Sequence, residues 1–78
     1  MDIVEGDIVE LTALDEDNPF PKLSNGLSGR VTGICEGYCM WVEFPYLKLL
    51  PHEVPSQKWG FPIYFHEARP IFSPFKPV

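Results

Sequence analysis

The fold is decided by residues 26–44, which read Gly26-Leu27-Ser28-Gly29-Arg30-Val31-Thr32-Gly33-Ile34-Cys35-Glu36-Gly37-Tyr38-Cys39-Met40-Trp41-Val42-Glu43-Phe44. Two β-rich runs flank a short segment that contains Gly37, which is typical of a β-hairpin. Because side chains alternate between the two faces of a strand, Met40, Val42 and Phe44 share one face, while Trp41 and Glu43 share the other. We therefore expect a hairpin that buries one face of its second strand.

The rest of the chain predicts further short strands around this hairpin. Residues 3–14 alternate apolar and polar side chains, which is typical of a half-buried strand. Residues 47–50 and 59–65 read as further extended segments, and residues 70–72 as a last short edge pairing. Nine prolines argue against long helices. The sequence therefore predicts an all-β fold, a small barrel or sandwich of about five strands.

Glycine and proline residues mark the predicted connections between the strands. Residues 15–25 predict a loop whose apolar members, Phe20 and Leu23, tuck under one end of the fold. Gly29 and Gly33 suggest strong coiling or a bulge in the strand that contains them. Residues 51–58 are long enough for a helical turn, and residues 66–69 form either a single turn or the end of a strand.

The chain of 78 residues predicts a single domain over residues 1–72 and an extended, polyproline-like tail over residues 73–78. No apolar run approaches the roughly 20 residues that span a bilayer, so we expect no membrane interaction. The first residues are acidic where a signal peptide would be basic, which favours a cytoplasmic protein.

The formal charge is −5, and it is unevenly distributed. Seven acidic residues and no Lys or Arg fall within the first 17 residues. Residues 18–78 hold four acidic against six basic residues, and so carry a net charge of +2. An acidic end of this kind favours cationic surfaces and opposes the approach of phosphate, unless it serves only to keep a small sheet protein in solution.

A resemblance supports the barrel. Gly6-Asp7-x-Val9-x-Leu11, then an acidic, Pro-containing loop and Lys22-Leu23-x-x-Gly26-x-x-Gly29-x-Val31, resembles the opening of SH3-like barrels of the KOW kind. It is also similar to small bacterial and phage proteins with that barrel, whose aromatic-rich strand is matched here by residues 40–44. The resemblance covers about residues 5–44. It implies a small SH3-like five-stranded barrel with a Pro- and aromatic-rich C-terminal extension, and it implies no chemistry, because this barrel hosts many tasks.

Metal binding is not indicated. Cys35 and Cys39 lack a second Cys pair, and the spacing of His52 and His66 matches no zinc finger. We expect the two cysteines to be small buried hydrophobes, although thiols facing each other across a hairpin could form a disulfide if oxidised. Residues 15–18 carry carboxylates but lack the glycine and the distal glutamate of a helix–loop–helix calcium site. We therefore predict no metal and no cofactor.

Catalytic motifs are not found either. His52-Glu53 and His66-Glu67 are adjacent pairs, and neighbours on a strand point to opposite faces, so neither carboxylate orients its histidine there. The sequence contains no Gly-x-Ser-x-Gly and no phosphate-binding loop. We predict that the protein is not an enzyme.

Protein binding is the function that the sequence favours, as an adaptor or a small inhibitor of a larger, basic partner. The acidic N-terminal face would steer association, and a surplus of aromatic residues would supply affinity. The predicted partner-binding residues are Tyr38, Trp41, Trp59, Phe61, Asp15 and Asp17. Three alternatives stay open: a nucleic-acid-associated KOW-type barrel, which the scattered basic residues make less favourable, a homodimer that buries Trp59 and Phe61, and a structural subunit of an oligomer or virion.

Overall fold

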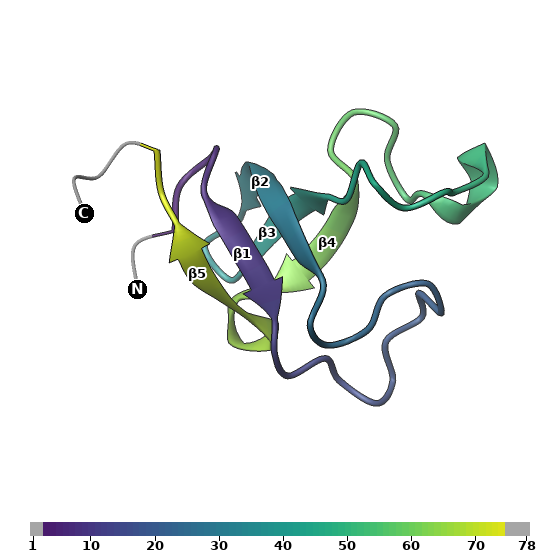
Figure 1. Cartoon of the computed structure of the whole chain (residues 1–78), viewed down its shortest axis with the longest axis horizontal. Coiled ribbons are helices and arrows are strands. Elements are labelled where there is room, and N and C mark those ends of the chain that lie inside the picture. Colours follow the sequence, from purple (N-terminus) through teal and green to yellow (C-terminus); the bar gives the residue numbers. More distant parts are fainter. Residues whose placement is uncertain (1–2, 75–78) are drawn as a thin grey trace.

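The computed structural model describes residues 3–74. These residues fold into one antiparallel sheet of five strands with two short 3₁₀ helices (Figure 1). In chain order the elements are β1 (Ile8–Leu11), β2 (Ser28–Cys35), β3 (Cys39–Glu43), η1 (Pro51–Glu53), β4 (Phe61–Tyr64), η2 (Phe65–Glu67) and β5 (Ala68–Phe72). The prediction of an all-β fold is confirmed.

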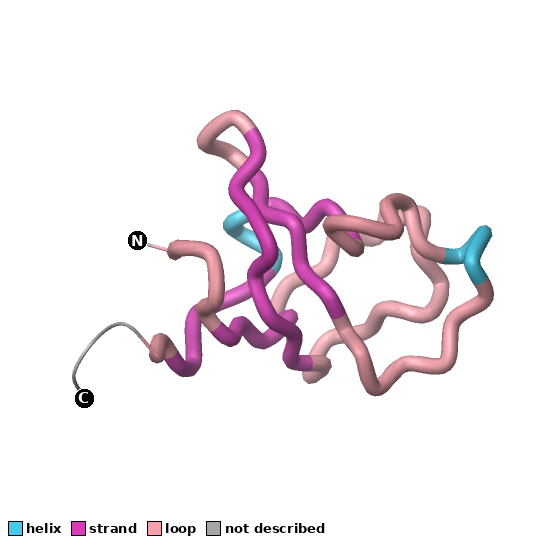
Figure 2. Tube along the Cα trace, turned by 90° about the horizontal axis from the view of Figure 1, so that it is seen from above, coloured by secondary structure: helices cyan, strands magenta, loops and turns pink. Residues whose placement is uncertain are grey.

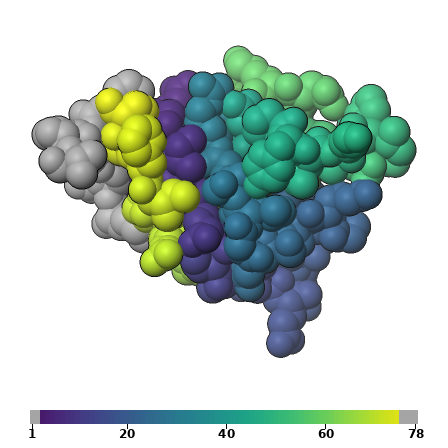
Figure 3. Space-filling view, in the orientation of Figure 1, coloured from purple at the N-terminus to yellow at the C-terminus, as the bar shows by residue number. Residues whose placement is uncertain are grey.

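The strand order in the sheet is β4-β3-β2-β1-β5. Strands β1 to β4 therefore pair with their neighbours in sequence, and β5 returns across the molecule to pair with β1. The single turn of η2 connects β4 to β5. Figure 3 shows β5 lying along β1 at the surface. Strands β4 and β5 are the two edges of this sheet, and no ladder between them closes it within the described residues.

One face of the sheet carries the core. Met40 and Val42 are completely buried and Phe44 is 4% exposed, so the predicted face of β3 is confirmed. The strongest burial is shared by residues from four strands: Val9, Leu11, Val31, Met40, Val42, Phe61 and Ile63. Leu23 is buried as well, and Phe20 packs its ring edge-on against Phe61 at a centroid distance of 5.1 Å, as predicted for the loop that holds them. The long loop is therefore anchored in the core.

Two glycines shape the hairpin as predicted. The register of β2 against β3 shifts between Val31 and Gly33, which places a bulge in β2. Gly29 faces the core, where a Cβ atom would lie 2.6 Å from the carbonyl oxygen of Glu43. The coiling of the sheet thus depends on backbone contacts that only glycine allows.

Two expectations for the strands are corrected. Residues 47–50 form no strand, because Pro51 starts η1 and the N–H of Leu50 donates to Glu53 Oε1 at 3.0 Å instead of to a neighbouring strand. The part of the β3–β4 connection that contains η1 projects away from the sheet (Figure 2). Strand β1 ends at Leu11, earlier than predicted, because the N–H groups of Thr12 and Ala13 both donate to the carbonyl of Glu67.

The other connections follow the predictions in part. Residues 51–53 form the expected helical turn. The single turn expected over residues 66–69 spans residues 65–67 instead, and Ala68 and Arg69 already belong to β5. Of the predicted tail, Ser73 and Pro74 belong to the described part, and residues 75–78 lie outside it. Within residues 3–74, no helix has the length and apolar character needed to cross a membrane.

Candidate partner-binding groove

A groove of about 480 Å³ opens where three connections of the fold meet. These are the loop between β1 and β2, the turn between β2 and β3, and the end of β4 with η2. Its lining residues are Asp15, Asp17, Asn18, Pro19, Phe20, Tyr38, Cys39, Pro62, Tyr64 and Glu67. Segments far apart in the sequence thus contribute to one surface.

Aromatic rings form one wall of the groove. Tyr38 and Tyr64 stack with their ring centroids 6.1 Å apart and 56% and 47% of the residues exposed. The ring of His66 also stacks on Tyr64, at a centroid distance of 5.7 Å and nearly parallel to it. Exposed rings held against one another are pre-organised, so a ligand that packs on them needs to order few side chains.

Carboxylates form the other wall. Asp15, Asp17 and Glu67 line the groove, whose described lining contains no Lys or Arg. The side chain of Asp15 is held 3.2 Å from His66 Nε2, which links the acidic loop to the aromatic stack. The groove therefore presents negative charge next to exposed aromatic faces, a combination that suits a cation.

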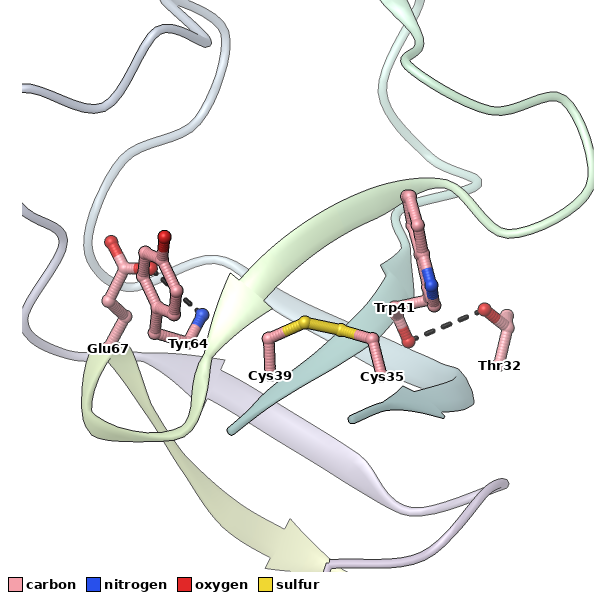
Figure 4. The surroundings of a disulfide bond; sticks show 6 residues. All are labelled: Thr32, Cys35, Cys39, Trp41, Tyr64 and Glu67. Carbon is pink, nitrogen blue, oxygen red and sulfur yellow. Dashed lines mark hydrogen bonds between the residues drawn. A yellow bond between two sulfur atoms is a disulfide. The ribbon is translucent and has the colours of Figure 1, made fainter. Parts of the chain in front are cut away.

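Glu67 holds the groove together. It is only 2% exposed, and its carboxylate accepts the N–H of Asp15 at 3.0 Å and the N–H of Tyr64 at 2.9 Å. Figure 4 shows the second of these contacts next to the hairpin. Because the two oxygens bind both walls, one buried side chain sets the distance between the acidic loop and the tyrosines. A buried carboxylate with both oxygens satisfied is a rigid link.

The hairpin turn presents Tyr38. Glu36 and Gly37 both have positive φ, at 50° and 80°, and the N–H of Tyr38 donates to the carbonyl of Cys35. Cys35 and Cys39 are joined by a disulfide across this turn (Figure 4), with their Cα atoms 5.1 Å apart. The expectation of two free buried thiols is therefore wrong, since paired positions on adjacent strands bring the sulfur atoms together.

The structure separates the six predicted partner-binding residues. Asp15, Asp17 and Tyr38 meet in the groove. Phe61 is corrected to a core residue, because it is 2% exposed and packs on Phe20 and Phe44. It belongs to the same strand as the exposed Tyr64, but its side chain points to the other face of the sheet.

The two tryptophans lie elsewhere. Trp41 is half-buried on the face of β3 opposite the core, where it pairs with Gly33. The ring of Trp59 covers Gly33, so closely that a Cβ atom there would lie 2.9 Å from it. The hydroxyl of Thr32 donates to the carbonyl of Trp59 at 2.6 Å and lies 3.3 Å from the carbonyl of Trp41. The ring of Trp59 thus packs the β3–β4 connection over the bulge.

Tyr64, Pro62 and Glu67 belong to the groove but were not among the predicted site residues. The alternation of residues 59–65 could have indicated that Tyr64 is exposed, because it lies on the strand face opposite the buried Phe61 and Ile63. Nothing local in the sequence marked Glu67, whose partners include an amide 52 positions away.

Within residues 3–74, no three His, Cys, Asp or Glu side chains are grouped so as to hold a metal ion. Comparison of the chain with protein-family models, curated proteins and solved structures found no match.

Proposed function

We propose that this chain is a non-catalytic protein-binding module whose groove receives a cationic, extended segment of a partner protein. The observation that carries the proposal is the meeting of Asp15 and Asp17 with the stacked rings of Tyr38 and Tyr64 in one groove. A Lys or Arg side chain laid along the rings would bring its charged end to the carboxylates. Tyrosines pre-organised in this way are typical of residues that dominate binding energy.

The arrangement of the strands supports an SH3-like barrel as the scaffold. Four strands form a meander, a single 3₁₀ turn follows β4, and β5 pairs back onto β1. That topology brings the β1–β2 loop, the β2–β3 turn and η2 to one end of the fold. A binding site made of connections on a rigid sheet is the usual way in which small β domains recognise ligands.

The charge distribution supports a cationic partner over nucleic acid. The loop that forms one wall holds Asp15, Glu16 and Asp17 and belongs to the acidic first 17 residues. Phosphate would meet repulsion at this wall, whereas a basic segment would be attracted before contact and held after it. An adaptor or an inhibitor of a larger basic protein would use the same contacts.

An affinity purification from the native host tests this function. The wild-type chain, Tyr38→Ala and Tyr46→Ala serve as baits, with and without nuclease treatment. Tyr46 is a matched control, because it is 55% exposed and lies outside the groove. The proposal predicts a stoichiometric protein partner that survives nuclease, is lost with Tyr38→Ala and is kept with Tyr46→Ala.

Other outcomes would replace the proposal. Partners that disappear with nuclease would favour a nucleic-acid-associated barrel of the KOW type. Equal recovery on both tyrosine variants would move the binding surface away from the groove. A chain that captures only itself, in a complex that Tyr38→Ala leaves intact, would favour a structural subunit.

A further inference from the structure

We infer that the groove binds residues 74–78 of a second copy of this chain, so that molecules associate head to tail at high concentration. This inference rests on the proposed function, because it gives the groove a specific cationic occupant. Residues 74–78 read Pro74-Phe75-Lys76-Pro77-Val78. Binding of these residues to the groove would compete with binding of an external partner.

The chemistry of this segment complements the groove. Lys76 is the only charged side chain in residues 73–78, and the groove offers Asp15 and Asp17 without a lining Lys or Arg. Pro74 and Pro77 are three positions apart, and a proline at every third position falls on one side of a polyproline II helix. Proline-rich segments dock in aromatic-lined grooves because little conformational entropy is lost when they bind.

The chain already packs a similar run at this place. Residues 18–23 read Asn18-Pro19-Phe20-Pro21-Lys22-Leu23, and residues 73–78 read Ser73-Pro74-Phe75-Lys76-Pro77-Val78. In the first run, Pro19 and Phe20 line the groove and Phe20 packs on Phe61. A second run of the same residue types could extend this apolar surface from the open side.

Strand β5 separates residues 74–78 from the groove of their own molecule, so the residues that occupy the groove come from a second molecule. The groove lies at the Ala68 end of β5, next to Glu67, and Phe72 lies at the other end, where it pairs with Ile8. Strand β5 spans roughly 13 Å at about 3.3 Å per residue. If the chain turned back after Pro74, Lys76 would have travelled only about 7 Å and would not reach the groove of its own molecule.

Sedimentation velocity over a concentration series up to about 1 mM at low salt tests the inference on the full chain. We expect the weight-average mass of the wild type to rise with concentration, and Lys76→Glu to weaken association by about three- to tenfold. Lys48→Glu is the matched control, since Lys48 is an exposed loop residue outside the groove. The double variant Asp17→Lys with Lys76→Glu exchanges the two charges and is expected to restore association.

Three results would overturn the inference: a wild type that is monomeric throughout, equal behaviour of Lys76→Glu and Lys48→Glu, or a charge exchange that restores nothing. A titration of the ¹⁵N-labelled chain with a synthetic peptide of residues 73–78 gives a second measurement. The inference predicts chemical-shift changes at the amides of Tyr38, Tyr64 and Asp17, and changes confined to another face would contradict it.

The experiments distinguish failure of this inference from failure of the proposed function. If Lys76→Glu leaves self-association unchanged but Tyr38→Ala still abolishes capture of an external partner, only the inference about residues 74–78 is wrong. If Tyr38→Ala changes neither measurement, the groove itself is not a binding site.

Discussion

The carboxylate of Glu67 accepts a hydrogen bond from the backbone N–H of Asp15 at 3.0 Å, across 52 positions of the sequence. Its other oxygen accepts the N–H of Tyr64 at 2.9 Å. This buried side chain therefore joins the acidic loop to the aromatic wall, and the shape of the groove depends on it. In a small sheet protein, such a link positions a site that the strands alone do not build.

Replacing Glu67 by Gln tests this role. The amide keeps one acceptor oxygen but turns an NH₂ group toward the second donor, so one partly buried N–H loses its partner. We expect the free energy of unfolding to fall by about 1–3 kcal/mol, measured by urea denaturation. Amide hydrogen exchange at Asp15 or Tyr64 should also become faster. Glu16→Gln, in the exposed part of the same loop, is the control, and unchanged exchange in Glu67→Gln would contradict the role of Glu67.

Substitutions at Phe61 and Tyr38 are expected to affect different properties, stability in the first case and partner binding in the second. Phe61→Ala would leave a cavity among Phe20, Phe44 and their neighbours, and we expect it to cost about 3–5 kcal/mol. Tyr38→Ala removes an exposed ring and should cost less than about 1 kcal/mol while it reduces partner capture. Thermal unfolding of both variants checks the difference. Equal losses of stability would show that Tyr38 is part of the core structure.

Gly29 and Gly26 form a matched pair. Gly26 has a φ of 99°, and no atom lies within 4 Å of the place that a Cβ atom would occupy, so Gly26→Ala introduces only backbone strain, of about 1 kcal/mol. At Gly29 the same methyl group would collide with Val42, Glu43 and Phe44. We therefore expect Gly29→Ala to lower the free energy of unfolding clearly more than Gly26→Ala does. Chemical denaturation of both variants measures the difference. The reverse order would show that the contact between β2 and β3 is looser than the structure indicates.

The disulfide between Cys35 and Cys39 closes a short loop. With a sequence separation of four, the bridge lowers the entropy of the unfolded chain by an amount that stabilises the fold by about 2 kcal/mol. We expect the double variant Cys35→Ser with Cys39→Ser, or reduction of the wild type, to lower the free energy of unfolding by up to that amount. Denaturation with and without a reductant measures the change, and reductant should not affect the double variant. An unchanged wild type would mean that the bridge does not constrain the hairpin.

The sequence was sufficient for the parts of the fold that local patterns encode. Period-2 alternation placed Met40, Val42 and Phe44 in the core, and the glycines of β2 indicated its bulge. The same reasoning failed for residues 47–50, where apolar composition resembles a strand but Pro51 starts η1 and the N–H of Leu50 donates to Glu53. Composition describes burial, whereas pairing depends on the rest of the sheet.

The candidate site was only half predictable for a similar reason. The charge of Asp15 and Asp17 and the turn position of Tyr38 are local properties, and these three residues do meet in one groove. Trp41, Trp59 and Phe61 were grouped with them as aromatics, but the two tryptophans lie at the bulge and Phe61 lies in the core. The contribution of Glu67 depends on a long-range contact that the local pattern does not show.

The most direct test of the central claim compares two adjacent carboxylates of the same loop. Asp17 lines the groove and its neighbour Glu16 does not, so Asp17→Lys and Glu16→Lys change the net charge equally but alter the groove only in the first case. The measurement is recovery of the protein partner from the same native extract on both variants and on the wild type. We predict that Asp17→Lys loses about nine-tenths of the partner while Glu16→Lys keeps most of it. Equal recovery on the two variants would contradict the groove as the binding site.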